Sequence, residues 1–131
     1  MCKGKITGTS KDEILFESIE ELDSILDQLN KEFSQKRPSL VEIEIKSGDI
    51  LAIGLGLNES LISYVSASGD PPYFISKGEK ENLEDTVVFY CHNEWSEFPS
   101  FALISMELAR TIVREFVKTG KLSDKIEWEE G

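Results

Sequence analysis

The alternation of hydrophobic and polar positions predicts a helix near the start of the chain. Ser18 and Glu21 have the spacing of a capping box, in which each side chain accepts a backbone N–H of the first helical turn. Apolar residues then recur at the three- and four-residue spacing of one helix face. This apolar stripe consists of Ile19, Leu22, Ile25 or Leu26, Leu29 and Phe33. We expect the helix to end before Pro38, because proline cannot continue it.

The middle of the chain changes to a period of two, which is typical of strands. "LVEIEIK" places Val41, Ile43 and Ile45 on one face and charged residues on the other. The turn "SGD" leads directly into "ILAIGLGLN", so these two strands must be antiparallel. "LISYVSA", "PYFISK" and, after the acidic loop "GEKENLED", "TVVFYCH" are further strands, and residues 14–16 are a weak strand candidate.

A second helix is predicted from Ser105, a favoured N-cap, to Gly120, a favoured C-cap. Lys118 in its last turn suits the helix dipole. Its apolar stripe consists of Met106, Ala109, Ile112, Val113, Phe116 and Val117. The final segment "KIEWEE" alternates as a strand, and we expect Trp128 to be a packing residue rather than a binding residue.

These elements predict an α+β fold, with an antiparallel sheet of about five or six strands packed on one face by two helices. The chain has 131 residues and no internal repeat or Pro/Gly-rich linker. We therefore expect residues 1–131 to form a single domain.

The charge of the chain narrows the classes of partner. There are 25 acidic and 14 basic residues, a net charge of −11. Such a field repels nucleic acid and anionic membranes and attracts basic proteins, although it also serves solubility alone. The longest apolar run, Ile50 to Leu57, is too short to span a bilayer. The first residues lack the apolar segment of a signal peptide, so we expect a cytoplasmic protein.

The stretch "YCHNEWSEFPS" gathers residue types that occur in active sites. Cys91 and His92 are neighbours on a predicted strand, so their side chains point to opposite faces and cannot readily hold one metal ion. Glu94 and Glu97 could act with His92 as the acid and base of a small hydrolase. A solvated hairpin turn is the favoured interpretation of the same residues. We expect no metal, no cofactor and free thiols at Cys2 and Cys91.

The "GLG" of Gly54 and Gly56 lacks the third glycine and the strand-to-helix turn of a phosphate-binding loop. We expect these glycines to admit a close helix or backbone, or to mark a bulge.

Aromatic residues lie beside acidic segments, which is typical of protein interfaces with a basic partner. Tyr73 and Trp95 are the predicted anchors, whereas Phe74 and Phe98 could equally belong to the core, with the acidic residues merely solvated. The predicted partner-binding residues are Tyr73, Glu79, Glu81, Glu84, Asp85, Glu94, Trp95 and Glu97.

Several short segments of the second half of the chain match the pattern of a known family. They are Tyr73 to Glu79, Glu97-Phe98-Pro99, Ser105-Met106-Glu107, Phe116 before Gly120, and Ile126 to Glu129. On these segments the chain, from about Ser39 onward, resembles the first-numbered family of immunity proteins from bacterial polymorphic toxin systems. Gly120 to Ser123 departs from the family pattern because it lacks a proline.

The resemblance implies a cytoplasmic antidote that binds a toxin, often one of the deaminase superfamily, and that carries no catalytic residues. We expect the acidic segments at residues 78–85 and 93–97 to meet a basic cleft of that toxin. The protein would be a monomer or weak homodimer. The alternatives are the small hydrolase and a non-toxin interaction module, because fold alone does not define function.

Overall fold

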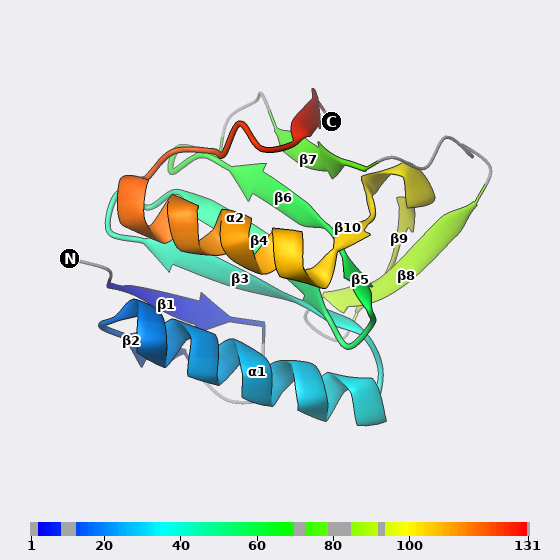
Figure 1. Ribbon diagram of the computed structural model, residues 1–131, viewed down its shortest axis with the longest axis horizontal. Coiled ribbons are helices and arrows are strands. Elements are labelled where there is room, and N and C mark those ends of the chain that lie inside the picture. The colour runs from blue at the N-terminus through cyan, green and yellow to red at the C-terminus, as the bar shows by residue number, and fades with distance from the viewer. Residues whose placement is uncertain (1–2, 9–12, 70–72, 79–84, 92–93, 131) are drawn as a thin grey trace.

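The computed structural model of the protein describes residues 3–8, 13–69, 73–78, 85–91 and 94–130 (Figure 1). It contains the helices α1 (Ile19–Gln35) and α2 (Met106–Thr119) and the 3-10 turn η1 (Ser100–Ala102). The strands are β1 (Gly4–Thr7), β2 (Ile14–Phe16), β3 (Ser39–Ile45), β4 (Ile50–Leu55), β5 (Glu59–Ser60), β6 (Ile62–Val65), β7 (Phe74–Lys77), β8 (Thr86–Cys91), β9 (Glu94–Pro99), β10 (Ile104–Ser105) and β11 (Glu127–Glu130).

The main sheet has nine strands and confirms the predicted α+β class. Seven strands follow the order β11-β7-β6-β4-β3-β1-β2, and each neighbouring pair is antiparallel. β8 adds a short parallel pairing with β3, and β9 pairs with β8. The sheet is larger than the expected five or six strands, because β1 buries only Ile6 and β9 carries glutamates where a strand pattern would show apolar residues.

Both helices begin at the predicted N-caps, α2 ends at the predicted C-cap, and α1 ends at Gln35, before Pro38 as expected. Ser18 Oγ accepts the Glu21 N–H at 3.1 Å, and Glu21 Oε1 accepts the N–H of Glu17, one residue earlier than in the standard capping box. At α2, Ser105 Oγ accepts the Leu108 N–H at 3.1 Å. Gly120 has φ of 74°, the left-handed conformation that glycine adopts without strain.

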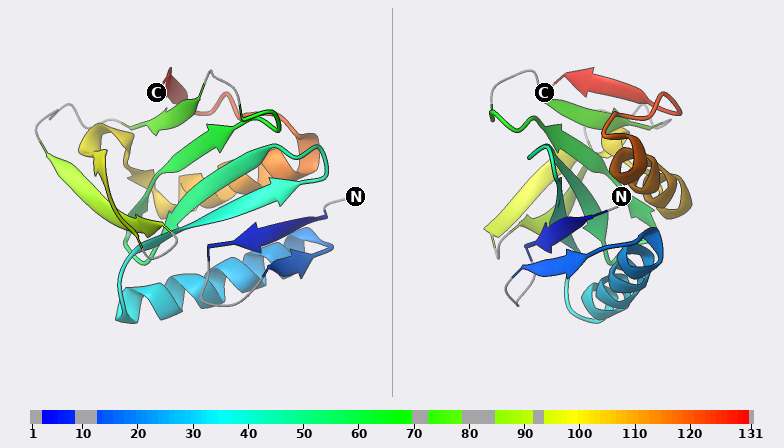
Figure 2. Two further views of the ribbon diagram at one scale, coloured as in Figure 1. Left: turned by 180° about the vertical axis from the view of Figure 1, so that it is seen from behind. Right: turned by 90° about the vertical axis from the view of Figure 1, so that its left-hand side faces the viewer.

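The two helices pack side by side on one face of the sheet (Figures 1 and 2). Leu22 and Leu26 from α1 and Ile112 and Phe116 from α2 are fully buried against the inward residues of the central strands. Trp128 packs against this core, and its Nε1 donates to the Ser123 carbonyl at 2.8 Å. The predicted packing role of Trp128 is therefore confirmed.

A second, smaller core lies on the opposite face of the sheet, where the β8–β9 hairpin folds over β3 and β4 (Figure 2). Phe89 is fully buried there beside Leu40 and Leu61. A Cβ atom on Gly54 would lie 2.6 Å from the Phe89 ring. Gly54 therefore makes room for the Phe89 side chain, and not for the helix or backbone that we expected. Gly56, at φ 106°, does lie against the backbone of Phe33, near the end of α1.

An ion-pair cluster joins the two helices. Arg110 is only 8% exposed and binds Asp27 Oδ1 at 2.7 Å and Asp23 Oδ1 at 3.1 Å. Arg114 Nε binds the same Asp23 carboxylate at 2.9 Å. We call Asp23, Asp27, Arg110 and Arg114 the inter-helix cluster. The sequence did contain a signal for this cluster. Asp23 and Asp27 are four residues apart, as are Arg110 and Arg114, and that spacing puts each pair on one face of its helix.

Candidate partner-binding surface

The β8–β9 hairpin has one face that packs on the sheet and one that faces outward. The register is regular from Thr86↔Pro99 to Cys91↔Glu94. Phe89 and Phe98, whose ring centroids are 6.4 Å apart, belong to the inward face with the second core. Because side chains alternate along a strand, Tyr90 and its cross-strand partner Trp95 lie on the outward face, together with Glu97.

Trp95 is the most exposed aromatic side chain in the described part of the chain, at 59%. It lies directly across from Tyr90, whose ring holds the Arg37 guanidinium 4.0 Å from its centroid. Residues directly opposite in an antiparallel pair place their side chains on the same face of the sheet, so Tyr90 and Trp95 share the outward face. The arrangement presents the exposed Trp95 indole to a partner on that face.

The residues expected to form an acidic loop at 94–97 instead belong to strand β9. That expectation was wrong, because β9 already pairs with β8 from Glu94 onward, opposite Cys91. Residues 92–93 lie outside the described residues. Glu94 and Glu97 are three residues apart on a regular strand, so their carboxylates project to opposite faces. This geometry disfavours the hydrolase alternative, in which the two carboxylates would flank one bond.

Tyr73 lies at a different place from Trp95 but on the same side of the sheet. It lines a hollow of about 360 Å³ together with Pro99 at the end of β9, Phe101, Ile75 and Glu129. The Tyr73 hydroxyl donates to the Gly69 carbonyl at 2.6 Å, while its ring remains 39% exposed. Trp95 is four residues from Pro99 along the strand, roughly 13 Å. The structure therefore brings Tyr73 to the end of β9 and not into contact with Trp95.

The other predicted interface residues fall on the segment before β8. Asp85 is exposed, and its carbonyl accepts the Ser100 N–H at 2.9 Å. Glu79, Glu81 and Glu84 lie outside the described residues.

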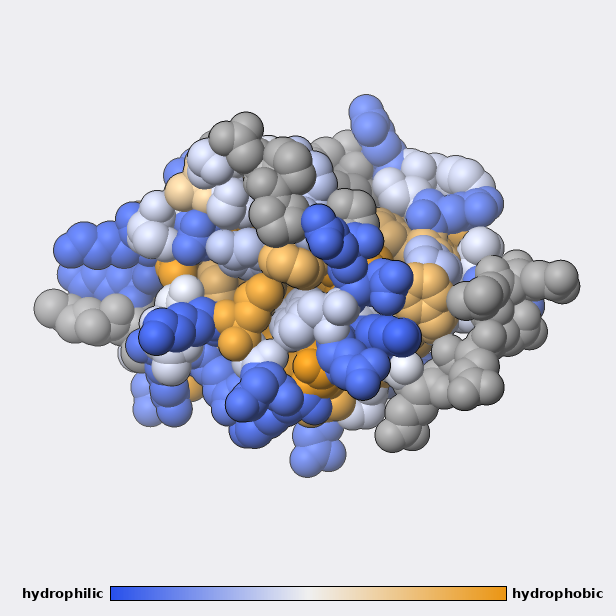
Figure 3. Space-filling view, turned by 90° about the horizontal axis from the view of Figure 1, so that it is seen from above, coloured by the Kyte–Doolittle hydropathy of each residue, from blue (hydrophilic) through white to orange (hydrophobic). Residues whose placement is uncertain are grey.

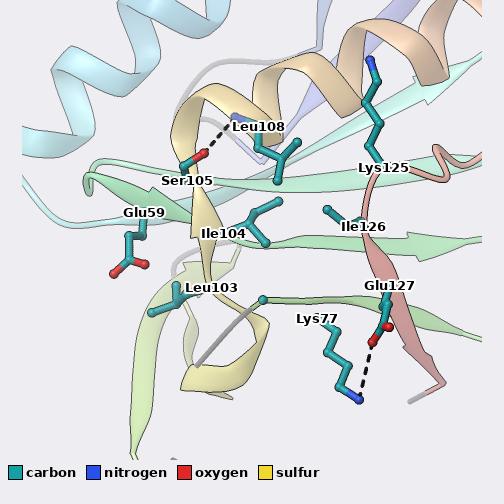
Figure 4. A pocket seen from close by; sticks show the side chains of 10 residues that line it. Glu59, Lys77, Leu103, Ile104, Ser105, Leu108, Lys125, Ile126 and Glu127 are labelled. Atoms are coloured by element: carbon teal, nitrogen blue, oxygen red, sulfur yellow. Dashed lines mark hydrogen bonds and ion pairs between the residues drawn. The ribbon is translucent and has the colours of Figure 1, made fainter. Parts of the chain in front are cut away.

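A hollow of about 620 Å³ lies between β7, the start of α2 and the segment before β11 (Figure 4). Leu103, Ile104, Leu108 and Ile126 supply its apolar walls. Its polar side chains bind within the protein: Lys77 Nζ lies 3.8 Å from Glu127, Lys125 Nζ lies 2.7 Å from Glu115, and Ser105 caps α2. These contacts join elements of the fold, so the hollow resembles a packing defect between them more than a catalytic centre.

Segments that carry the family resemblance meet around this hollow. Gly78, Ser105, Ile126 and Glu127 all line it. The Gly78 N–H donates to the Phe101 carbonyl at 2.6 Å, and a Cβ atom on Gly78 would collide with the Leu103 carbonyl. These segments therefore fix the path of the chain from η1 into α2.

The sheet ends on this side in an acidic edge strand. β11 exposes Glu127, Glu129 and Glu130, with Lys77 3.8–3.9 Å from the first two. Viewed from the side of β7 and β11, the surface is mostly hydrophilic with smaller apolar areas between the charged side chains (Figure 3). Charges along an edge strand oppose pairing with another chain.

Within the ranges that the structure describes, no cluster of three or more His, Cys, Asp or Glu side chains is arranged to hold a metal ion. No helix in those ranges is long and apolar enough to cross a membrane. The side chain of Cys91 and all of His92 are outside the description, so the Cys–His arrangement stays a prediction.

Comparison with known families decides the class of the protein. The sequence matches the family described as immunity protein Imm1 over residues 10–130. The chain belongs to the Imm1 family. No curated protein is significantly similar to it. Membership confirms the resemblance noted in the sequence and extends it to nearly the whole chain. As an Imm1 protein the chain has an immunity role, and that role implies a toxin as its partner.

Proposed function

We propose that this Imm1 protein neutralises its toxin by covering a basic, substrate-binding surface with the outward face of the β8–β9 hairpin, and that it performs no reaction itself. The exposed Trp95 beside Glu97 is the observation that carries this proposal. A large aromatic side chain within a patch of opposite charge is a common centre of a protein interface.

The charge of the molecule supports a basic partner. The chain carries a net −11, and both Glu94 and Glu97 are exposed on β9. A toxin that acts on nucleic acid needs positive charge to bind phosphates, so an acidic protein can compete for the same surface. The family resemblance makes a nucleic-acid deaminase the first candidate for this toxin. Tyr73 and Asp85 would extend the interface beyond the hairpin.

Co-expression tests the immunity role. The toxin encoded by the adjacent open reading frame should arrest bacterial growth when it is expressed alone, and this chain should restore growth. A neighbour that is harmless alone, or an arrest that the chain does not relieve, would contradict the proposal. If the chain is an interaction module with another partner, it would leave the growth arrest unrelieved.

Two charge-matched double variants test the site. Glu94→Gln with Glu97→Gln removes one exposed charge from each face of β9. It should slow association with the toxin several-fold at low salt and reduce its salt dependence, because exposed charges at or near an interface act mainly on the association rate. The control, Glu20→Gln with Glu107→Gln, removes the same charge from exposed positions of α1 and α2. Stopped-flow association at two ionic strengths measures both. Equal slowing by the two variants would show that only the net charge matters, and would move the interface away from β9.

A further inference from the structure

Strand β9 has one edge that pairs with no other strand in the described ranges. β9 is bonded only to β8. The Tyr90 N–H donates to the Pro38 carbonyl at 2.9 Å, so it points away from β9. Opposite residues in an antiparallel pair alternate between hydrogen-bonded and non-hydrogen-bonded positions. Tyr90 and Trp95 are therefore a non-hydrogen-bonded pair.

The other end of the hairpin gives the same alternation. The Ser100 N–H donates to the Asp85 carbonyl at 2.9 Å, which makes these two residues a hydrogen-bonded pair in continuation of the register. Because the two kinds of pair alternate, Val87 and Phe98 are again hydrogen-bonded, and the next pair, Val88 and Glu97, is non-hydrogen-bonded. The backbone N–H and C=O groups of Trp95 and Glu97 consequently point to the open edge of β9.

This edge is less protected against strand pairing than β11, although Glu94, Glu97 and Pro99 lie along it. The β8–β9 register contains no bulge, and β9 contains no lysine. Pro99 closes the edge at one end, because it has no N–H to donate. By contrast, three exposed glutamates cover β11 at the end of the sheet. The open segment is short, and its two residues are those with the exposed indole and carboxylate.

We infer that the toxin adds an extended, basic segment to the open edge of β9 as a further strand. The inference rests on the proposed function and specifies how that surface binds. The N–H and C=O groups of Trp95 and Glu97 bond to the added strand, the indole of Trp95 covers it, and a Lys or Arg of the toxin pairs with the Glu97 carboxylate. A second copy of this chain is the less suitable occupant, because each copy carries a net charge of −11.

Amide hydrogen exchange of the complex, followed residue by residue by NMR, tests the strand addition. The toxin from the adjacent open reading frame is the probe. Exchange of the Trp95 and Glu97 amides should slow at least about tenfold on binding, as expected for newly bonded edge amides. The Val88 amide, on the other edge of the hairpin, should change little. A complex in which the Trp95 and Glu97 amides exchange at their unbound rates would overturn the inference. Slow exchange in concentrated protein without toxin would identify a second copy as the occupant.

A proline substitution removes one edge donor. Glu97→Pro deletes an N–H that the β8 ladder does not use, so the hairpin should still form. It should weaken toxin binding about tenfold more than Glu97→Ala, which loses only the carboxylate. Val88→Pro is the matched control on the opposite edge, and thermal unfolding checks that all three variants are folded.

The outcomes separate the two proposals. If the unmodified chain does not neutralise the toxin, the proposed function fails. If it neutralises the toxin but Glu97→Pro binds as Glu97→Ala does, the strand addition alone fails.

Discussion

The helix side and the hairpin side of the sheet use acidic residues in opposite ways. Between α1 and α2, the carboxylates of Asp23 and Asp27 are bound by Arg110 at 3.1 and 2.7 Å. On β9, Glu94 and Glu97 have no ion-pair partner among the described residues and point into solvent. A net charge of −11 therefore does not by itself locate an interface.

The difference follows from what each side must bury. In the inter-helix cluster the Arg110 side chain is buried, where an unpaired charge would be costly, so its carboxylate partners on α1 hold the two helices in one arrangement. The hairpin buries its apolar residues on the inward face alone, which leaves the outward face available for a partner. We therefore expect substitutions on the helix side to lower stability, and substitutions on the hairpin side to weaken toxin binding.

Loss of the Arg110 guanidinium should have the largest effect on stability. Arg110→Ala removes a side chain that is only 8% exposed, and should lower the free energy of unfolding by about 3 kcal/mol, mainly through lost packing. The lost ion pairs add less, because Asp23 keeps Arg114 and Asp27 is largely exposed. Urea unfolding measures it. Arg37→Ala is the hairpin-side control, since its guanidinium lies over the Tyr90 ring, and it should cost about 1 kcal/mol or less. Equal losses would remove the distinction between the two sides.

The two tryptophans should separate binding from stability. Trp95→Ala should weaken toxin binding by about 2 kcal/mol, roughly 30-fold, while the free energy of unfolding changes by less than about 0.5 kcal/mol. Calorimetric titration and urea unfolding give the two numbers.

Trp128→Ala should show the reverse, with about 2–3 kcal/mol lost in unfolding, because that ring packs on the main core. Unchanged affinity in folded Trp95→Ala would place the interface elsewhere.

The sequence predicted most of the helix side because its patterns are local. Caps at Ser18, Ser105 and Gly120, and the apolar stripes of both helices, depend on spacings of three or four residues. The strand alternation of residues 40–57 likewise gave the antiparallel pair β3 and β4. The inter-helix cluster was missed because its residues are 83–91 positions apart in the chain, and no local pattern specifies which helix faces meet.

The hairpin side was predicted less well, because its outward face is polar and its partner strand is chosen by tertiary packing. "EWSEFP" lacks an apolar alternation, so the segment seemed to be a loop, and the pairing of Tyr90 with Trp95 was missed. Trp95 was nevertheless chosen correctly as an exposed aromatic residue. Its role as an anchor stays a prediction.

The smallest expected effect concerns the pH dependence of a helix-side carboxylate. Hydrogen bonds from the Lys125 ammonium and the Ser123 hydroxyl lower the pKa of Glu115 and join α2 to the segment before β11. A lowered pKa in the folded state means that the ionised carboxylate stabilises the fold above the ordinary glutamate pKa, about 4.3, and that this stabilisation is lost as pH falls through the folded pKa. Glu115→Gln should therefore be less stable than the unmodified chain at neutral pH, and the difference in stability should shrink as the pH falls below the ordinary glutamate pKa. Thermal midpoints at several pH values measure it, with Glu94→Gln on the hairpin expected to leave the neutral-pH midpoint unchanged. If the difference in thermal midpoint stayed constant down to acid pH, the bond to Lys125 would not depend on the charge of Glu115. Ion pairs would then stabilise the helix side less than the inter-helix cluster suggests.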